Sequence, residues 1–178
     1  MSGLRQPVLH NDLFDIETVP KLELVTDAVE QLASHSENDE RGAIYTRIEV
    51  VEFILDLVGY VDTESLHHKS ILEPSFGEGD FLLPVIERLF TAWRKHGGNV
   101  SIAHIELRNA IRGVELHRET YLATRKKIIN RLIAEGMTME SATELADQWL
   151  IQGDFLLEMY AMRFDFVVGN PPYVRQEL

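Results

Sequence analysis

The 178-residue sequence contains no cysteine. This absence excludes disulfide bonds, thiolate metal ligands and catalysis by a thiol nucleophile. Seven histidines are present, but none of them shows the spacing of zinc ligands. We therefore expect surface or loop roles for the histidines and no metal site.

Long apolar runs and positive charge are also scarce. No stretch of about 18 uninterrupted apolar residues occurs, and residues 1–5 have no apolar segment behind them. We therefore expect a cytoplasmic protein with no membrane partner. The formal net charge of −12 has the wrong sign for a surface that collects phosphates from solution. If the substrate is DNA, most of the basic contact surface must lie elsewhere.

Short apolar runs alternate with segments of helical periodicity, and the hydrophobic content of 45% is enough for one globular domain. The runs predict strands over 71–73, 111–116, 149–152 and 164–168, and the periodic segments predict helices over 46–58, 81–93, 118–134 and 138–149. Residues 97–110 look like an inserted turn and short helix. Strands that alternate with helices predict an α/β fold with a doubly wound, mostly parallel sheet.

The first candidate site follows the first predicted strand and reads Glu73-Pro74-Ser75-Phe76-Gly77-Glu78-Gly79. In an open parallel sheet, ligands bind at the carboxyl ends of the strands. Gly77 and Gly79 allow a sharp turn and a close approach of the backbone to a ligand. The loop lacks a phosphate-binding lysine motif, and its carboxylates would repel a polyphosphate. It suits a cationic ligand, such as a sulfonium with an ammonium tail, although an ordinary strand-to-helix turn has the same glycines.

Two further candidate sites follow the next two predicted strands. Glu115 could accept hydrogen bonds from both hydroxyls of a ribose, and a solvated strand-end carboxylate is the plain alternative. Asp154 could accept a hydrogen bond from an adenine amino group, and the ring of Phe155 could stack on that base. Gly153-Asp154 alone is also a common turn. Each of these residues therefore depends on the others for a functional interpretation.

The sharpest motif is Asn170-Pro171-Pro172-Tyr173, which follows the predicted strand 164–168. Two prolines after a buried strand prevent its continuation and fix a rigid loop. An asparagine side-chain oxygen and a proline-held carbonyl, aimed together, accept both hydrogens of an NH₂ group and leave the nitrogen lone pair for an electrophile. Tyr173 offers a face for stacking on a planar group, as a base rotated out of a duplex requires.

The segments 43–46, 73–79 and 170–177, in this order, resemble the gamma-class DNA adenine methyltransferases of restriction-modification systems. The resemblance implies a Rossmann-like fold that binds S-adenosylmethionine and methylates the 6-amino group of adenine. It covers residues 41–178, which it implies form a catalytic methyltransferase domain. Over residues 1–40, apolar residues at helical spacing between 22 and 32 predict a helical and extended N-terminal segment.

The same resemblance implies a role for each motif residue. Tyr45 and Thr46 would border the methionine end of the cofactor, Glu73, Pro74, Ser75, Gly77 and Gly79 would surround the methionine, Glu115 would hold the ribose, and Asp154 and Phe155 would take the cofactor adenine. Asn170 and Pro171 would bind the target amine, Pro172 would complete the loop, and Tyr173 would stack on the flipped base.

The family fold needs further strands, and usually a target-recognition domain, beyond residue 178. We therefore expect this chain to be the cofactor-binding and catalytic fragment of a larger enzyme, with DNA bound mainly through regions absent from it. The strand at 164–168 would leave an unpaired sheet edge, which predicts self-association or a partner chain that completes the sheet. Two alternatives stay open: a glutamine methyltransferase of the release-factor type, which shares the Asn-Pro-Pro-Tyr loop, and a fragment that binds cofactor or a partner without catalysis.

Overall fold

The computed structural model describes residues 47–158 and 163–170, all within one unit of the chain, Ala43–Leu178. The predicted N-terminal segment and the residues after Asn170 lie outside the described residues. None of the helices in the described ranges combines the length and the apolar character that crossing a membrane requires.

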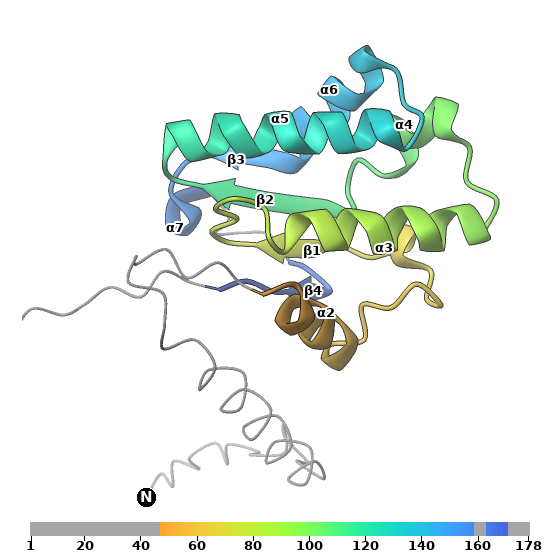
Figure 1. Ribbon diagram of the computed structural model, residues 1–178, viewed down its shortest axis with the longest axis horizontal. Coiled ribbons are helices and arrows are strands. Elements are labelled where there is room, and N and C mark those ends of the chain that lie inside the picture. Colours follow the sequence, from red (N-terminus) through yellow and green to blue (C-terminus); the bar gives the residue numbers. More distant parts are fainter. Residues whose placement is uncertain (1–46, 159–162, 171–178) are drawn as a thin grey trace, which may run out of the picture. The chain divides into compact units, whose positions relative to one another are not determined.

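Four parallel strands form the sheet. They are β1 (Ile71–Glu73), β2 (Ile111–Glu115), β3 (Leu150–Gln152) and β4 (Phe166–Val167). Their order across the sheet is β3-β2-β1-β4 (Figure 1). In β1, Ile71 pairs with Ile111 on one side and with Phe166 on the other. The predicted α/β fold with a parallel sheet is confirmed.

The direction in which the chain winds changes between β1 and β4. From β1 the chain moves outward through β2 to β3, and it then returns to the other side of β1 as β4. Ligands of open parallel sheets bind at such a switch point, next to the carboxyl ends of the two strands. The loops after β1 and β4 therefore flank the expected binding position.

Helices precede and connect the strands, and the four longest described helices lie at the predicted positions. They are α2 (Ile48–Leu57), α3 (Leu82–Lys95), α4 (Ala103–Glu106), α5 (Arg118–Ala134), α6 (Met139–Trp149) and α7 (Phe155–Glu158), with 3-10 turns η1 (Leu66–His68) and η2 (Val100–Ile102). Thr138 caps α6, because its side chain accepts a hydrogen bond from Ser141 N at 3.2 Å.

The two faces of the sheet are covered differently. Alternate residues of a strand point to opposite faces, and on one face Ile71, Ile111 and Leu150 join a large core with side chains of α2, α3, α5 and α6. Figure 1 shows α3 and α5 running alongside the strands. The opposite face carries a small apolar cluster that consists of Leu72, Val114, Ile151, Phe155 and Phe164. Most of the hydrophobic stabilisation therefore comes from the first face.

Two buried tryptophans fasten the segment between α3 and β2. The Nε1 of Trp93 donates a hydrogen bond to Glu106 Oε2, and the Nε1 of Trp149 donates one to Leu107 O, each at 2.8 Å. This segment contains η2 and α4 and corresponds to the predicted insertion at 97–110. It lengthens the sequence between the glycine loop and Glu115 while β1 and β2 stay paired.

The short strand β4 is fixed beside β1 by hydrogen bonds near the start of both strands. The carboxylate of Asp165 accepts hydrogen bonds from Ser70 N at 2.8 Å and from Ser70 Oγ at 3.1 Å, and these bonds lower the pKa of Asp165. The amide of Val168 donates to Leu72 O at 2.9 Å. In the described part of the chain, no strand lies on the outer side of β4. The predicted open edge is therefore present in that part of the sheet.

Candidate cofactor and catalytic site

The loop after β1 makes a tight turn into α3. Gly77 and Gly79 have φ values of +49° and +88°, in the left-handed region that glycine adopts most readily. Gly79 N donates a hydrogen bond to Phe76 O at 2.8 Å. The ring of Phe76 is buried in the core, and its N–H donates to Val114 O of β2 at 3.1 Å. The core and the neighbouring strand therefore fix the loop together.

Glu115, at the end of β2, is buried and contacts this loop directly. Its Oε2 accepts a hydrogen bond from Gly77 N at 3.0 Å, and its Oε1 accepts one from His117 N at 2.8 Å. The structure thus brings the first and second candidate sites together. Each carboxylate oxygen keeps a lone pair that could accept a hydrogen bond from a ribose hydroxyl. Support of the loop is an additional role that the sequence did not indicate.

Glu73, at the end of β1, is equally buried but differently surrounded. Its Oε2 has no hydrogen-bond partner among the described residues. Burial, followed by the charges of Asp80 and Glu115, raises the pKa of Glu73 well above its usual range. A buried carboxylate without a partner carries a desolvation cost that a bound cation would offset. This acidic pair of strand ends therefore suits a positively charged ligand.

Helix α5 supports the loop through residues that the sequence interpretation missed. The hydroxyl of Thr124 is fully buried and donates a hydrogen bond to Gly77 O at 2.7 Å. Lys127 Nζ lies 3.1 Å from the Glu78 carboxylate. Thr124 shares a helical stripe with Ile128, which is buried in the core. In the sequence, the signal for the contact between Thr124 and Gly77 was a polar residue on an otherwise apolar helical stripe.

A cavity of about 310 Å³ lies at the switch point between β1 and β4. Its walls come from α2, from the start of the glycine loop and from the end of β4, namely Ile54, Val58, Pro74, Ser75, Val167, Val168, Gly169 and Asn170. A Cβ atom added to Gly169 would lie 3.5 Å from Pro74 Cδ, so the two loops are in van der Waals contact. Asn170, the first residue of the Asn-Pro-Pro-Tyr motif, therefore shares this cavity with the start of the glycine loop.

The third candidate site adjoins the end of β2 as well. Gly153 N donates a hydrogen bond to Glu115 O at 3.0 Å. The exposed carboxylate of Asp154 accepts a hydrogen bond from Leu156 N at 2.9 Å at the start of α7. Phe155 packs against the small apolar cluster on the second face of the sheet. The assignment of Asp154 and Phe155 to the cofactor adenine stays a prediction.

Five of the predicted site residues lie outside the described residues: Tyr45, Thr46, Pro171, Pro172 and Tyr173. Their roles also stay predictions. Among the described residues, the structure brings together the glycine loop, Glu73, Glu115 and Asn170 at the carboxyl ends of β1, β2 and β4.

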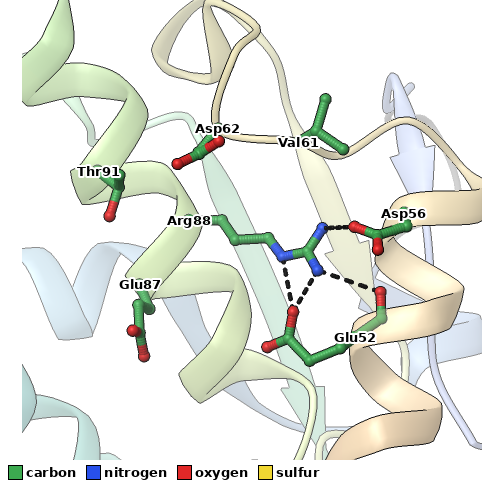
Figure 2. A pocket seen from close by; sticks show the side chains of 7 residues that line it. All are labelled: Glu52, Asp56, Val61, Asp62, Glu87, Arg88 and Thr91. Atoms are coloured by element: carbon green, nitrogen blue, oxygen red, sulfur yellow. Dashed lines mark hydrogen bonds and ion pairs between the residues drawn. The ribbon is translucent and has the colours of Figure 1, made fainter.

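A second cavity, of about 320 Å³, lies between α2 and α3. Figure 2 shows Arg88 reaching from α3 toward Glu52 and Asp56 of α2. Its guanidinium donates to both carboxylates, to Tyr60 O at 2.9 Å and to Glu52 O at 3.1 Å. This set of bonds fastens α2, which forms one wall of the switch-point cavity. Arg88 therefore supports the candidate site from outside it.

A third cavity, of about 250 Å³, is lined by the adjacent residues His67 and His68 and by His96, which is distant from them in the sequence. The ring centroid of His67 lies 4.0 Å from that of His68 and 5.2 Å from that of His96. Burial, followed by the neighbouring histidines, lowers the pKa of His67. Within the described ranges, no group of three or more histidine or carboxylate side chains is arranged to hold a metal ion.

The parallel sheet, its switch point and the two loops that meet there define a Rossmann-like α/β fold of the methyltransferase type. A family profile described as N-6 DNA Methylase matches residues 21–177. The chain belongs to this family.

Named relatives agree with the family assignment. The type II methyltransferase M.PaeR7I of Pseudomonas aeruginosa is 54% identical over 154 residues, which are 86% of this chain and 27% of that protein. M.XhoI of Xanthomonas vasicola is 49% identical over 79% of this chain and 26% of its own length, and M.BstVI of Geobacillus stearothermophilus is 43% identical over 77% and 25%. The chain spans about a quarter of the length of these relatives. No solved structure matches it.

Proposed function

We propose that this chain supplies the S-adenosylmethionine-binding and catalytic part of a DNA adenine methyltransferase of a restriction-modification system. The observation that carries the proposal is the switch-point cavity, because it joins Pro74 and Ser75 of the acidic glycine loop to Gly169 and Asn170 of the acceptor motif. A methyl transfer needs its donor and acceptor side by side. Membership in the N-6 DNA methylase family favours DNA over a release-factor glutamine as the substrate.

The charges and hydrogen-bonding groups of the loop fit S-adenosylmethionine. The cofactor carries a sulfonium and an ammonium, and Glu73 presents a buried carboxylate oxygen without a partner in the described residues. We assign the methionine to the glycine loop with Tyr45 and Thr46, the ribose to Glu115, and the adenine to Asp154 and Phe155. When bound, the cofactor supplies an electrophilic methyl group.

The acceptor side is assigned to the Asn-Pro-Pro-Tyr loop. The side-chain oxygen of Asn170 and the backbone carbonyl of Pro171 accept the two hydrogens of the adenine 6-amino group. This orientation directs the nitrogen lone pair toward the methyl group. Pro172 restricts the loop, and Tyr173 stacks on an adenine rotated out of the duplex. The residues contribute by alignment, and the motif order supports assignment to the gamma class.

DNA contact and oligomeric state are further parts of the proposal. The net charge of −12 means that most phosphate contacts come from regions outside this chain, which spans about a quarter of its relatives. The outer edge of β4 carries Val167, which is 60% exposed. Self-association or a partner chain at this edge would pair its backbone and cover its apolar surface.

Calorimetric titration of S-adenosylmethionine into the chain tests the cofactor half. Glu73→Gln removes the ionisable carboxyl group, which could pair with the cationic ligand, and keeps the shape, so we expect its affinity to fall about tenfold or more. Asp154→Ala tests the adenine end in the same way. Glu64→Gln is the matched control, because Glu64 is an exposed carboxylate that precedes β1 in the chain and is not part of the glycine loop. A folded wild-type chain that does not bind S-adenosylmethionine would contradict the proposal.

Methyl transfer to unmethylated duplex DNA tests the acceptor half in the longer enzyme to which we assign this chain. Asn170→Ala removes the side-chain acceptor, so we expect transfer to fall by about a hundredfold or more while cofactor affinity stays unchanged. Equal transfer by both proteins would exclude the role assigned to Asn170.

A further inference from the structure

Three polar or charged side chains are buried in the described ranges, and all three adjoin the glycine loop. They are Glu73, Glu115 and Thr124. Glu73 begins the loop and Glu115 accepts a hydrogen bond from it. Thr124 comes from a different element, α5, and its role lies outside the function proposed above.

Thr124 and Glu115 both form hydrogen bonds with the backbone of Gly77, one with each of the two peptide units that flank its Cα. Thr124 Oγ1 donates to Gly77 O at 2.7 Å, and Glu115 Oε2 accepts from Gly77 N at 3.0 Å. The backbone donor and acceptor of Gly77 are thus both paired with buried side chains. The methyl group of Thr124 also lies under the loop, because a Cβ added to Gly79 would lie 2.9 Å from Thr124 Cγ2.

A threonine in a helix has a simpler way to satisfy its hydroxyl. It can donate to the carbonyl of the residue four positions earlier in its own helix, as Thr143 does to Met139 O at 2.7 Å. Thr124 donates instead to a residue 47 positions away in the sequence. Its hydroxyl therefore contributes to the conformation of the loop, whereas that of Thr143 acts within one helix.

We propose that Thr124 is a positioning residue for the cofactor, which acts by fixing the Gly77–Gly79 turn from beneath. The proposal rests on the cofactor role assigned to this loop above. The hydroxyl orients the Gly77–Glu78 peptide, and the methyl group limits how closely Gly79 approaches α5. Glu115 then meets the Gly77 amide at a fixed position, and the face of the loop opposite Thr124 is left for the ligand.

Two substitutions separate the contribution of the Thr124 hydroxyl from that of its methyl group. Thr124→Val keeps the shape and removes the donor, which leaves Gly77 O without its buried partner. We expect a loss of about tenfold in S-adenosylmethionine affinity and faster amide hydrogen exchange at residues 76–80. Thr124→Ser keeps the donor, so we expect its affinity to stay close to that of the wild type. Thr143→Val is the matched control and should change neither quantity.

The experiment combines calorimetry with hydrogen exchange measured by mass spectrometry on the unliganded chain. Faster exchange confined to the loop in Thr124→Val, with weaker binding and rescue by serine, supports the positioning role. Wild-type binding and wild-type loop exchange in Thr124→Val overturn it, as does a rise in exchange spread evenly over β2 and α6. If the folded wild-type chain does not bind S-adenosylmethionine, the proposed function fails, and loop exchange alone then decides whether Thr124 fixes the turn.

Discussion

The carboxylates that end β1 and β2 have similar sequence settings and opposite surroundings. Glu73 and Glu115 each end a buried strand, and each is 3% exposed. Glu115 accepts hydrogen bonds from Gly77 N and His117 N. The Oε2 of Glu73 has no partner among the described residues. The difference arises because the loop after β1 turns over the end of β2, where its amide reaches Glu115.

This comparison separates stability from binding at two neighbouring strand ends. A carboxylate that accepts two backbone N–H bonds stabilises the loop in the absence of any ligand. A buried carboxylate with an unpartnered oxygen destabilises the empty protein and attracts a cation. Substitution by glutamine should therefore change the free energy of unfolding in opposite directions at Glu73 and at Glu115.

The largest expected effect is that of Glu115→Gln. The amide NH₂ of glutamine must face either Gly77 N–H or His117 N–H, so one charge-assisted hydrogen bond becomes a contact between two donors. We expect the free energy of unfolding to fall by roughly 3–4 kcal/mol. Urea denaturation at neutral pH measures this loss, with Glu64→Gln as the control. Unfolding of Glu115→Gln at the wild-type urea concentration would remove the distinction between the two carboxylates.

The two glycines of the loop should also differ, in the stability that is lost when each is replaced by alanine. Gly79 has a φ of +88°, and an added Cβ would lie 2.9 Å from Thr124 Cγ2, whereas nothing lies within 4 Å of an added Cβ at Gly77. Gly79→Ala combines backbone strain with overpacking, so we expect a loss of about 2–3 kcal/mol. Gly77→Ala carries the strain alone and should cost about 1 kcal/mol. Equal losses in thermal unfolding would show that Thr124 does not support the loop at Gly79.

Much of the fold, and which of the described candidate-site residues lie near one another, could be predicted from the sequence. The apolar run 71–73 and the periodic segment 118–134 gave the order of strands and helices, because burial requires those patterns. The rule that ligands bind at strand ends then placed Glu115 and Asn170 near the glycine loop. These predictions depend on local patterns and on topology.

The pairing of individual polar groups could not be predicted in the same way. Whether the Gly77 amide meets Glu73 or Glu115 depends on how the loop turns, and both carboxylates occupy equivalent positions in the sequence. Thr124 resembles any small residue on a buried helix face until its partner 47 residues away is known. Arg88 is likewise separated by 36 residues from Glu52. Hydrogen bonds between distant segments leave no periodic signal in the chain.

The expected effect of Glu73→Gln on stability is smaller than that of Glu115→Gln and has the opposite sign. The pKa of Glu73 is raised in the folded protein, by burial first and then by Asp80 and Glu115. Between its ordinary value of 4.5 and the raised value, the folded chain holds a proton that the unfolded chain has released. Stability therefore falls as pH rises through this window. Below 4.5 both states are protonated, and this cost disappears.

Glutamine removes the titration, so Glu73→Gln should be more stable than the wild type above the window by roughly 1–2 kcal/mol. The difference should shrink as pH is lowered toward about 4, where wild-type Glu73 is protonated in both states. Thermal unfolding followed by circular dichroism from pH 4 to 8 measures the trend, and Glu64→Gln should follow the wild-type curve. A variant that is less stable than the wild type at neutral pH would mean that Glu73 already has a stabilising partner. Glu73 would then resemble Glu115, and a bound cation would no longer be needed to offset its burial.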